Sequence, residues 1–475
     1  MSTKSVAKNS IFNVVYRLVN MLFPLVTSVY VSHILMASGI GKVSYAQNIA
    51  QYFIFLAPLG IVNYGIREIA KIRLDKKGTN KLFSELFSLN FISTICCSLF
   101  YYLMVLESGW YDDDRLLYIV TGLPIIFNVI NVDWYYQGQE DYGYIAIRNI
   151  CIKLLALISM LCFVHSTEDY IVYALIYSFG IIGNYLFNTF NLVRKGVRLT
   201  LKNLDIKKHL KPVFILLSSN VAIEIYVLLN TTMLGYYCSD AIVGYYTNSM
   251  KLVKIVVGLI TAIGSVLLPR LSFYRNQGLI KECGDLISKV FMVMFFFALP
   301  CGIGIFLLAD YIVPLMFGDS FIPAIQTTKI ATIIIYVLGF SNLFGTQVLL
   351  TFGQEKKLLL CTCIAAILNL LMNFFLIPLY QHNGAVISSV ICETLVAMMT
   401  FLFAKKFITV HIEYSFILKT ICATFVMGSC VYAVRFLNMG NNLWVLLLSV
   451  FLGSLVYLMV TMILKNPLLN LVKKP

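Results

Sequence analysis

Long runs of hydrophobic residues, separated by short polar segments, recur along the whole chain. Most runs are close to the roughly 20 residues that a helix needs to cross the hydrocarbon core of a bilayer. Hydrophobic positions are continuous within each run instead of alternating with polar ones, which excludes a membrane β-barrel and predicts helices. Fourteen spans are expected, at residues 10–33, 44–66, 83–106, 116–137, 145–165, 169–191, 212–236, 243–268, 288–309, 325–351, 358–378, 384–404, 417–437 and 443–464.

Composition agrees with this pattern. Hydrophobic residues make up 60% of the chain and charged residues 12%, and the mean hydropathy is +0.85. Soluble domains have about half apolar and a quarter charged residues, so the sequence predicts an all-α integral membrane protein. The first run, Ile11–Leu35, is too long for a signal peptide and is expected to remain as the first transmembrane helix.

The net charge of +14 is distributed by topology. Six cations lie between Arg67 and Lys81 and seven between Arg194 and Lys211, whereas the intervening loops are poor in cations and include Asp112–Asp114. Cytoplasmic loops of membrane proteins carry such an excess of Lys and Arg. We therefore expect both termini in the cytoplasm and no role in binding nucleic acid.

The chain also repeats itself. Arg67 and Arg270 close corresponding spans 203 residues apart, and Gly138-Gln-Glu recurs 215 residues later as Gly353-Gln-Glu. Two six-helix lobes of parallel topology are expected, which is an architecture of alternating access. The predicted parts are an N-terminal lobe, a cytoplasmic linker, a C-terminal lobe and an appended pair of helices with a cytoplasmic tail, at 1–193, 194–211, 212–404 and 405–475.

A few charged residues lie inside the predicted spans, where each costs about 2.5–3.5 kcal/mol on insertion scales and usually faces a cavity or a partner. These residues are Arg17, Arg148, Lys153, Lys251, Lys254 and Glu224. Five of the six are cations, which suits an anionic substrate such as a phosphate or pyrophosphate.

The alternatives differ from residue to residue. Arg148 is near enough to the inner interface to extend its charge into the headgroups. Lys251 and Lys254 enter from the outer side and share one helix face, so the excess of cations in inner loops does not explain them. Glu224 is either an ion-pair partner of a buried lysine or a carboxylate that binds a proton or cation during transport.

The fourth span ends in Trp134-Tyr-Tyr-Gln-Gly138-Gln-Glu140, and Arg148-Asn149 and Lys153 follow. This stretch resembles the signature of the O-antigen and capsule flippases in the multidrug/oligosaccharidyl-lipid/polysaccharide exporter superfamily. Lys8-Asn-Ser and Asn63-Tyr-Gly65 are similar to that family too, and the resemblance extends over essentially the whole chain.

The resemblance implies a flippase that moves an undecaprenyl-pyrophosphate-linked repeat unit to the outer leaflet of the bacterial inner membrane. It implies a cationic central cavity between the lobes and the use of an ion gradient. Arg17, Lys251 and Lys254 are expected to line this cavity, with Arg148 and Lys153 as further members. Membrane lipids, a polysaccharide polymerase and a chain-length regulator are the expected partners.

Two other functions compete with this interpretation. A multidrug cation antiporter of the same fold would want acidic residues in its cavity. A polytopic enzyme such as a polysaccharide polymerase would need a long outer loop, but the longest here, Asp310–Pro323, is short. His165, Ser166 and Glu168 lie in one tight turn and form no convincing triad. No P-loop or CxxC pair is present, so we expect no cofactor, no metal and no enzymatic activity.

Overall fold

The computed structural model describes residues 6–200, 204–265, 267–411, 413–436 and 442–468. The prediction of an all-helical membrane protein is confirmed. Within these ranges ten helices are long and apolar enough to cross a bilayer, or eleven if the bent helix that begins at Lys207 counts as one span. The exact number of fourteen spans stays a prediction.

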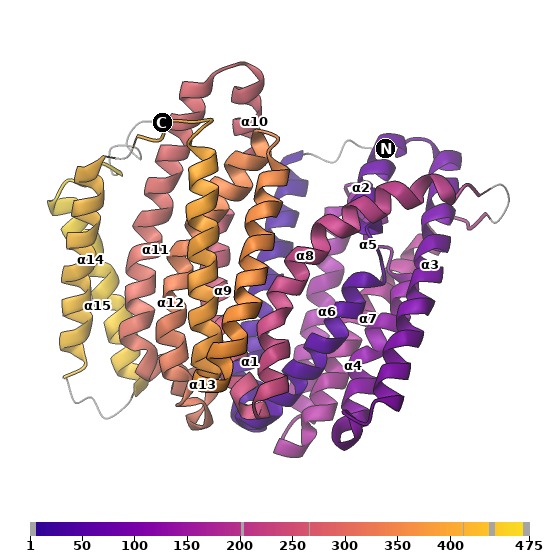
Figure 1. The fold of residues 1–475 in the computed structure, drawn as a ribbon, viewed down its shortest axis with the longest axis horizontal. Helices are drawn as coiled ribbons and strands as arrows, with labels where there is room; N and C mark the ends of the chain where they lie inside the picture. Colours follow the sequence, from indigo (N-terminus) through magenta and orange to yellow (C-terminus); the bar gives the residue numbers. More distant parts are fainter. Residues whose placement is uncertain (1–5, 201–203, 266, 412, 437–441, 469–475) are drawn as a thin grey trace. The chain divides into compact units, whose positions relative to one another are not determined.

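Contacts divide the chain into two compact units, Met1–Gly235 and Tyr236–Pro475. The predicted lobe and linker boundaries rest on the internal repeat of the sequence. A division of the chain by contacts does not test that repeat, so the boundaries stay a prediction. The helices that make up the first unit are α1 (Val6–Leu56), α2 (Ile61–Ile72), α3 (Lys76–Glu107), α4 (Arg115–Phe127), α5 (Asp133–Gly138), α6 (Tyr142–Phe163), α7 (Tyr170–Arg194) and nearly all of α8 (Lys207–Tyr237) (Figure 1).

The second unit contains the helices α9 (Asp240–Ser265), α10 (Leu268–Asn276), α11 (Ile280–Phe317), α12 (Ala324–Ser341), α13 (Glu355–Ala404), α14 (Tyr414–Val434) and α15 (Asn442–Ile463). A π-helical segment, Asn342–Leu349, continues α12.

The two longest helices are each broken once. α1 is interrupted at Met36, which has a φ of 56°, and α13 at Gln381, with a φ of 50°. These left-handed conformations are uncommon for residues other than glycine. Each break falls between two predicted spans, so α1 contains spans 10–33 and most of 44–66, and α13 contains spans 358–378 and 384–404.

An aromatic core holds one end of the first unit together. Trp134 in α5 is 2% exposed, and its ring stacks on Phe83 of α3 with centroids 5.7 Å apart. Tyr64 from α2 and Val213 from α8 are buried in the same cluster. The start of α8 is therefore packed into the first unit.

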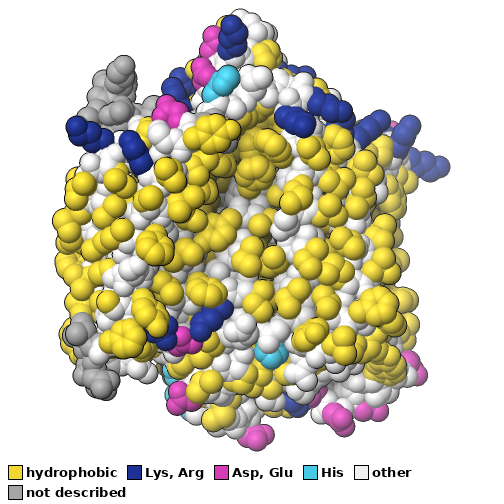
Figure 2. Space-filling view, turned by 60° about the vertical axis from the view of Figure 1, so that its left-hand side comes forward, with side chains coloured by type: hydrophobic (Ala, Val, Ile, Leu, Met, Phe, Trp, Pro, Cys, Tyr) yellow, Lys and Arg dark blue, Asp and Glu magenta, His cyan; other side chains and the backbone are white. Residues whose placement is uncertain are grey.

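In the second unit, α14 and α15 lie side by side and pack against α11 (Figure 1). Tyr457 of α15 donates a hydrogen bond of 2.7 Å to the carbonyl oxygen of Phe296 in α11, and Phe416 of α14 is buried in the same core. Figure 2 shows this side of the unit, where hydrophobic side chains cover most of the surface and charged side chains gather mainly towards its ends. Such a surface suits a helix bundle solvated by lipid.

Candidate functional site

Lys153 of α6 lies against α1 in the middle of the first unit. Its Nζ donates a hydrogen bond of 3.3 Å to the carbonyl oxygen of Val19 and lies 4.8 Å from the ring centre of Phe23. Pro24, inside α1, has no N–H to donate to the carbonyl oxygen of Asn20, so α1 lacks one helix hydrogen bond next to this contact. No carboxylate pairs with Lys153 in the described part of the chain.

A neighbouring amide pair reinforces this contact. Asn149, one turn before Lys153 in α6, donates a hydrogen bond of 3.0 Å from its Nδ2 to the Oδ1 of Asn20 in α1. Arg17 lies three residues before Asn20 in α1, but its side chain is outside the part of the chain that the structure describes. The structure thus brings Lys153 to the part of α1 that contains Arg17, and leaves the partners of Arg17 undefined.

Arg148 has a different environment from Lys153. Its side chain is 4% exposed, and its Nη1 lies 2.9 Å from Oδ1 of Asp133. The guanidinium also donates to Asn184 at 3.0 Å and to Asn188. Its charge is therefore matched by a carboxylate and two amides, and it joins α5, α6 and α7.

Lys251 is half-buried in α9, in the second unit. Its Nζ donates a hydrogen bond of 3.2 Å to Oδ1 of Asn248, which is itself fully buried. No described carboxylate pairs with Lys251. Lys254 follows three residues later in the same helix and is exposed. Glu224 is half-buried in α8 and belongs to the first unit.

Several other cations near span ends meet carboxylates. Lys42 lies 2.7 Å from Asp114 in the first unit. In the second, Asp310 binds both Lys329, at 2.7 Å, and Arg435, at 2.8 Å. Lys153 and Lys251 differ from these paired cations, because their described hydrogen-bond partners are neutral oxygens.

The two lysines also share a depth in their helices. Each stands eleven residues after the first residue of its helix (142 to 153, and 240 to 251). That separation corresponds to roughly 16 Å along the helix axis, about half the thickness of a bilayer core. An ammonium at this depth without a carboxylate is costly, so it indicates a polar pathway or an anionic ligand.

A buried carboxylate that the sequence analysis missed lies in the first unit. Glu85 of α3 is 1% exposed, and its Oε2 lies 2.9 Å from both Nε2 of His209 and Nζ of Lys208. Its Oε1 accepts a hydrogen bond of 3.0 Å from the backbone N–H of Asp205. We call Glu85, Asp205, Lys208 and His209 the α8 anchor, because they bind the start of α8 to α3.

The tautomer of His209 follows from its partners. A carboxylate only accepts, so Nε2 carries the proton that it donates to Glu85. Nδ1 shares a hydrogen bond of 2.8 Å with the hydroxyl of Tyr64, and in a neutral ring it is the acceptor of that bond. The sequence signal for this site was a glutamate just inside the predicted span 83–106 and a histidine in a cationic segment, 124 residues apart.

The tryptophan-containing motif is structural in this geometry. A Cβ at Gly65 would lie 2.5 Å from Cε3 of Trp134, and one at Gly138 would lie 2.7 Å from atoms of Ile69. Both glycines thus allow α5 to pack closely on α2. The left-handed residue of the following turn is Glu140, with a φ of 56°, and its carboxylate pairs with Arg73 at 2.8 Å.

Comparisons with known proteins agree with this architecture. Residues 6–274 match the family described as "Polysaccharide biosynthesis protein". A protein of Escherichia coli K12 named "Putative O-antigen transporter" is 23% identical over 413 residues, which are 85% of this chain and 97% of the relative.

Two solved structures show the shared fold. The lipid II flippase MurJ in an inward closed conformation superposes with a TM-score of 0.77 at 15% identity, covering 98% of this chain and all of that one. An inward-facing multidrug MATE transporter of the MOP superfamily gives a TM-score of 0.64 at 14% identity, covering 83% and 97%. The reported relatives are named as transporters or flippases and not as enzymes. Because the family match covers more than half of its length, this chain belongs to the polysaccharide biosynthesis protein family, in agreement with the resemblance that its sequence indicated.

Proposed function

We propose that this protein flips an undecaprenyl-pyrophosphate-linked oligosaccharide repeat unit from the cytoplasmic to the outer leaflet of the bacterial inner membrane. Transport proceeds by alternating access and is driven by an ion gradient. The carrying observation is that Lys153 and Lys251 lie at mid-span depth with neutral oxygen partners and no described carboxylate. A pyrophosphate would supply the missing negative charge.

The cations are assigned different roles. Arg17, Lys251 and Lys254 are proposed to contact the pyrophosphate, and Lys153 to bind it beside α1. Arg148 is proposed to act indirectly, because Asp133, Asn184 and Asn188 already occupy its Nε and Nη1 donors. It would hold α5, α6 and α7 in place around the pathway.

The multidrug antiporter of the same fold remains the alternative. A MATE transporter is among the structures that share this fold, so fold does not separate the two functions. Charge supports the flippase, because an organic cation would be repelled by unneutralised lysines. Glu224 is proposed as the coupling carboxylate, and a polymerase and a chain-length regulator as partners that receive the product.

The test is complementation of a strain that lacks its O-antigen flippase, with membrane abundance measured in parallel. Arg17→Ala, and the double variant Lys251→Ala, Lys254→Ala, should strongly reduce surface polysaccharide. Loss of one charge-assisted contact of about 1.5–3 kcal/mol lowers transport by roughly ten- to a hundredfold. Arg17→Lys retains activity if charge alone matters and loses it if a bidentate phosphate contact is needed.

The matched control is Lys405→Ala with Lys406→Ala, which removes two exposed charges at the end of α13. This control should complement fully. Full complementation by the Arg17, Lys251 and Lys254 triple alanine variant at normal abundance would rule out a cationic pathway. Glu224→Gln should lower transport without lowering abundance if Glu224 binds the coupling ion, whereas a fall in abundance alone would make it an ion-pair partner.

A further inference from the structure

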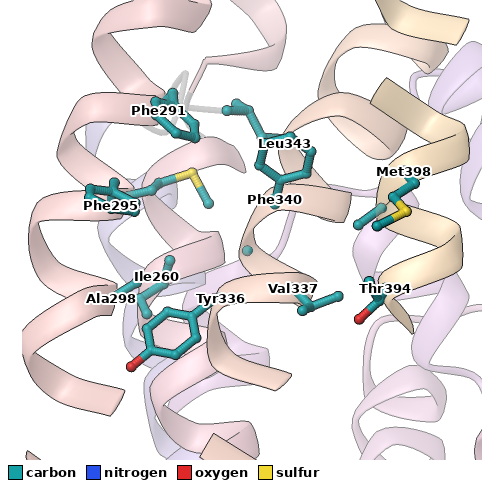
Figure 3. Close-up of a pocket in the computed structure, with 13 residues that line it drawn as sticks. Ile260, Phe291, Phe295, Ala298, Tyr336, Val337, Phe340, Leu343, Thr394 and Met398 are labelled. Carbon is teal, nitrogen blue, oxygen red and sulfur yellow. The ribbon is translucent and has the colours of Figure 1, made fainter. Parts of the chain in front are cut away.

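An apolar groove of about 370 Å³ lies within the second unit. Figure 3 shows Phe291 and Phe295 of α11 on one side of it and Met398 of α13 on the other, with Tyr336 and Phe340 of α12 between them. Its volume is within the range of about 300–1,000 Å³ that ligand pockets occupy. All these helices are candidate membrane spans.

The groove offers no free side-chain polar atom to a ligand. Among its lining residues only Tyr336 and Thr394 carry polar side-chain atoms. The Tyr336 hydroxyl donates to the carbonyl oxygen of Leu299 at 3.3 Å, and the Thr394 hydroxyl to that of Val390 at 2.6 Å. A buried water needs two to four polar partners. Water and polar ligands are therefore disfavoured here, and a hydrocarbon is favoured.

The wall formed by α13 continues onto an exposed apolar face. Met398 is 59% exposed, and Ile391 and Leu402 lie on the same side of the helix and are 42% and 49% exposed. Their spacings of seven and four residues place them along one stripe. Such a stripe at membrane depth requires hydrocarbon around it, so the groove opens where lipid chains are the surrounding solvent.

We propose that this groove holds one acyl chain of a bilayer phospholipid as a resident ligand of the second unit. Occupancy depends on the ratio of ligand concentration to Kd. Acyl chains are the bulk solvent of the membrane, whereas any carrier lipid is dilute in it, so mass action favours the phospholipid. The chain fills space between α11 and α13 that side chains leave open. This role is separate from the transported substrate and does not depend on the proposed function.

The test counts lipids on the intact protein, purified in a mild detergent, by native mass spectrometry. Wild type should retain one phospholipid, and adding phospholipid to delipidated protein should raise its Tm. Val337→Phe, which places a ring in the groove, should lose the bound lipid and the Tm response. The matched control is Ile333→Phe, one turn earlier in α12 at a residue that is exposed and does not line the groove. It should keep both.

Three results would overturn the proposal. Wild type could retain no phospholipid, Val337→Phe could retain as much as wild type, or the retained molecule could be an isoprenoid lipid, which would assign the groove to the substrate. If Val337→Phe does not accumulate, wild type decides the matter with a phospholipid that carries a diazirine in its acyl chain. Its crosslinks should map to Phe295, Phe340 or Met398, and crosslinks confined to other residues would refute the site.

Discussion

The α8 anchor makes a graded prediction for the stability of the first unit. Glu85→Ala removes the carboxylate that binds His209, Lys208 and the backbone of Asp205, and leaves polar groups buried without partners. Breaking a buried pair from one side costs about 3–5 kcal/mol, a factor of roughly 150–5,000 in the ratio of folded to unfolded protein.

Two milder variants calibrate this value. Glu85→Gln retains an oxygen for the N–H of Asp205, and its amide can donate to Nε2 if His209 changes tautomer, so we expect a loss of about 1–2 kcal/mol. The Lys208 side chain is 46% exposed, and Lys208→Ala should therefore cost less than about 1 kcal/mol. The predicted order of destabilisation is Glu85→Ala, then Glu85→Gln, then Lys208→Ala.

A natural fluorophore next to the anchor reports on this unfolding. Trp134 is buried against Phe83, two residues from Glu85 in the chain, whereas Trp110 and Trp444 are exposed. A background with Trp110→Phe and Trp444→Phe leaves Trp134 as the single tryptophan. Its emission during thermal or denaturant unfolding in detergent follows the region of the anchor.

Two outcomes would exclude the stabilising role given to the Glu85 carboxylate. If Glu85→Ala unfolds at the same denaturant concentration as Lys208→Ala, then the buried carboxylate contributes no more than its exposed ion pair. Equal losses for Glu85→Ala and Glu85→Gln would instead mean that charge, and not hydrogen bonding to neutral partners, holds the start of α8.

Other predictions follow from the ion pairs and the topology. Asp133→Ala should destabilise the first unit by about 3–5 kcal/mol because it leaves a buried guanidinium, and adding Arg148→Ala should restore part of the loss; a double variant as unstable as the sum of the singles would contradict the pair. In a cysteine-free background, an impermeant thiol reagent is applied to cells whose outer membrane is permeabilised and whose inner membrane is intact. It should label Glu168→Cys and not Lys77→Cys, and the reverse pattern would invert the predicted topology.

The helical architecture was predictable because hydrophobic runs of membrane length dictate it directly. The spans at 10–33 and 44–66, and those at 358–378 and 384–404, appear as helical segments on either side of Met36 and Gln381. What the pattern could not predict is that a single left-handed residue, Met36 or Gln381, separates the two helices of each pair. In the sequence, a polar loop and a turn at a single left-handed residue look the same, because both appear as a gap between two hydrophobic runs.

The partners of the charged residues were harder to predict from the sequence than the helices. Inspection of the spans identified Lys153, Lys251 and Arg148, because a charge within an apolar run is visible locally. It could not distinguish Arg148, which has a carboxylate from α5, from Lys153, which has a backbone oxygen from α1. Glu85 was missed for the same reason, since its partners lie more than a hundred residues away.

The docking of α8 on α2 and α3 has a consequence for biosynthesis and for dividing the gene. Gly60 approaches α8 so closely that a Cβ there would lie 2.3 Å from the carbonyl oxygen of Val213. A ribosome that has made only residues 1–193 has produced Glu85 but not His209, so the nascent first unit still lacks the groups that neutralise its buried carboxylate. Coexpressed fragments divided within the cationic segment 194–211, before His209, should therefore assemble poorly. A first fragment that continues through Gly235 contains both sides of the α8 anchor.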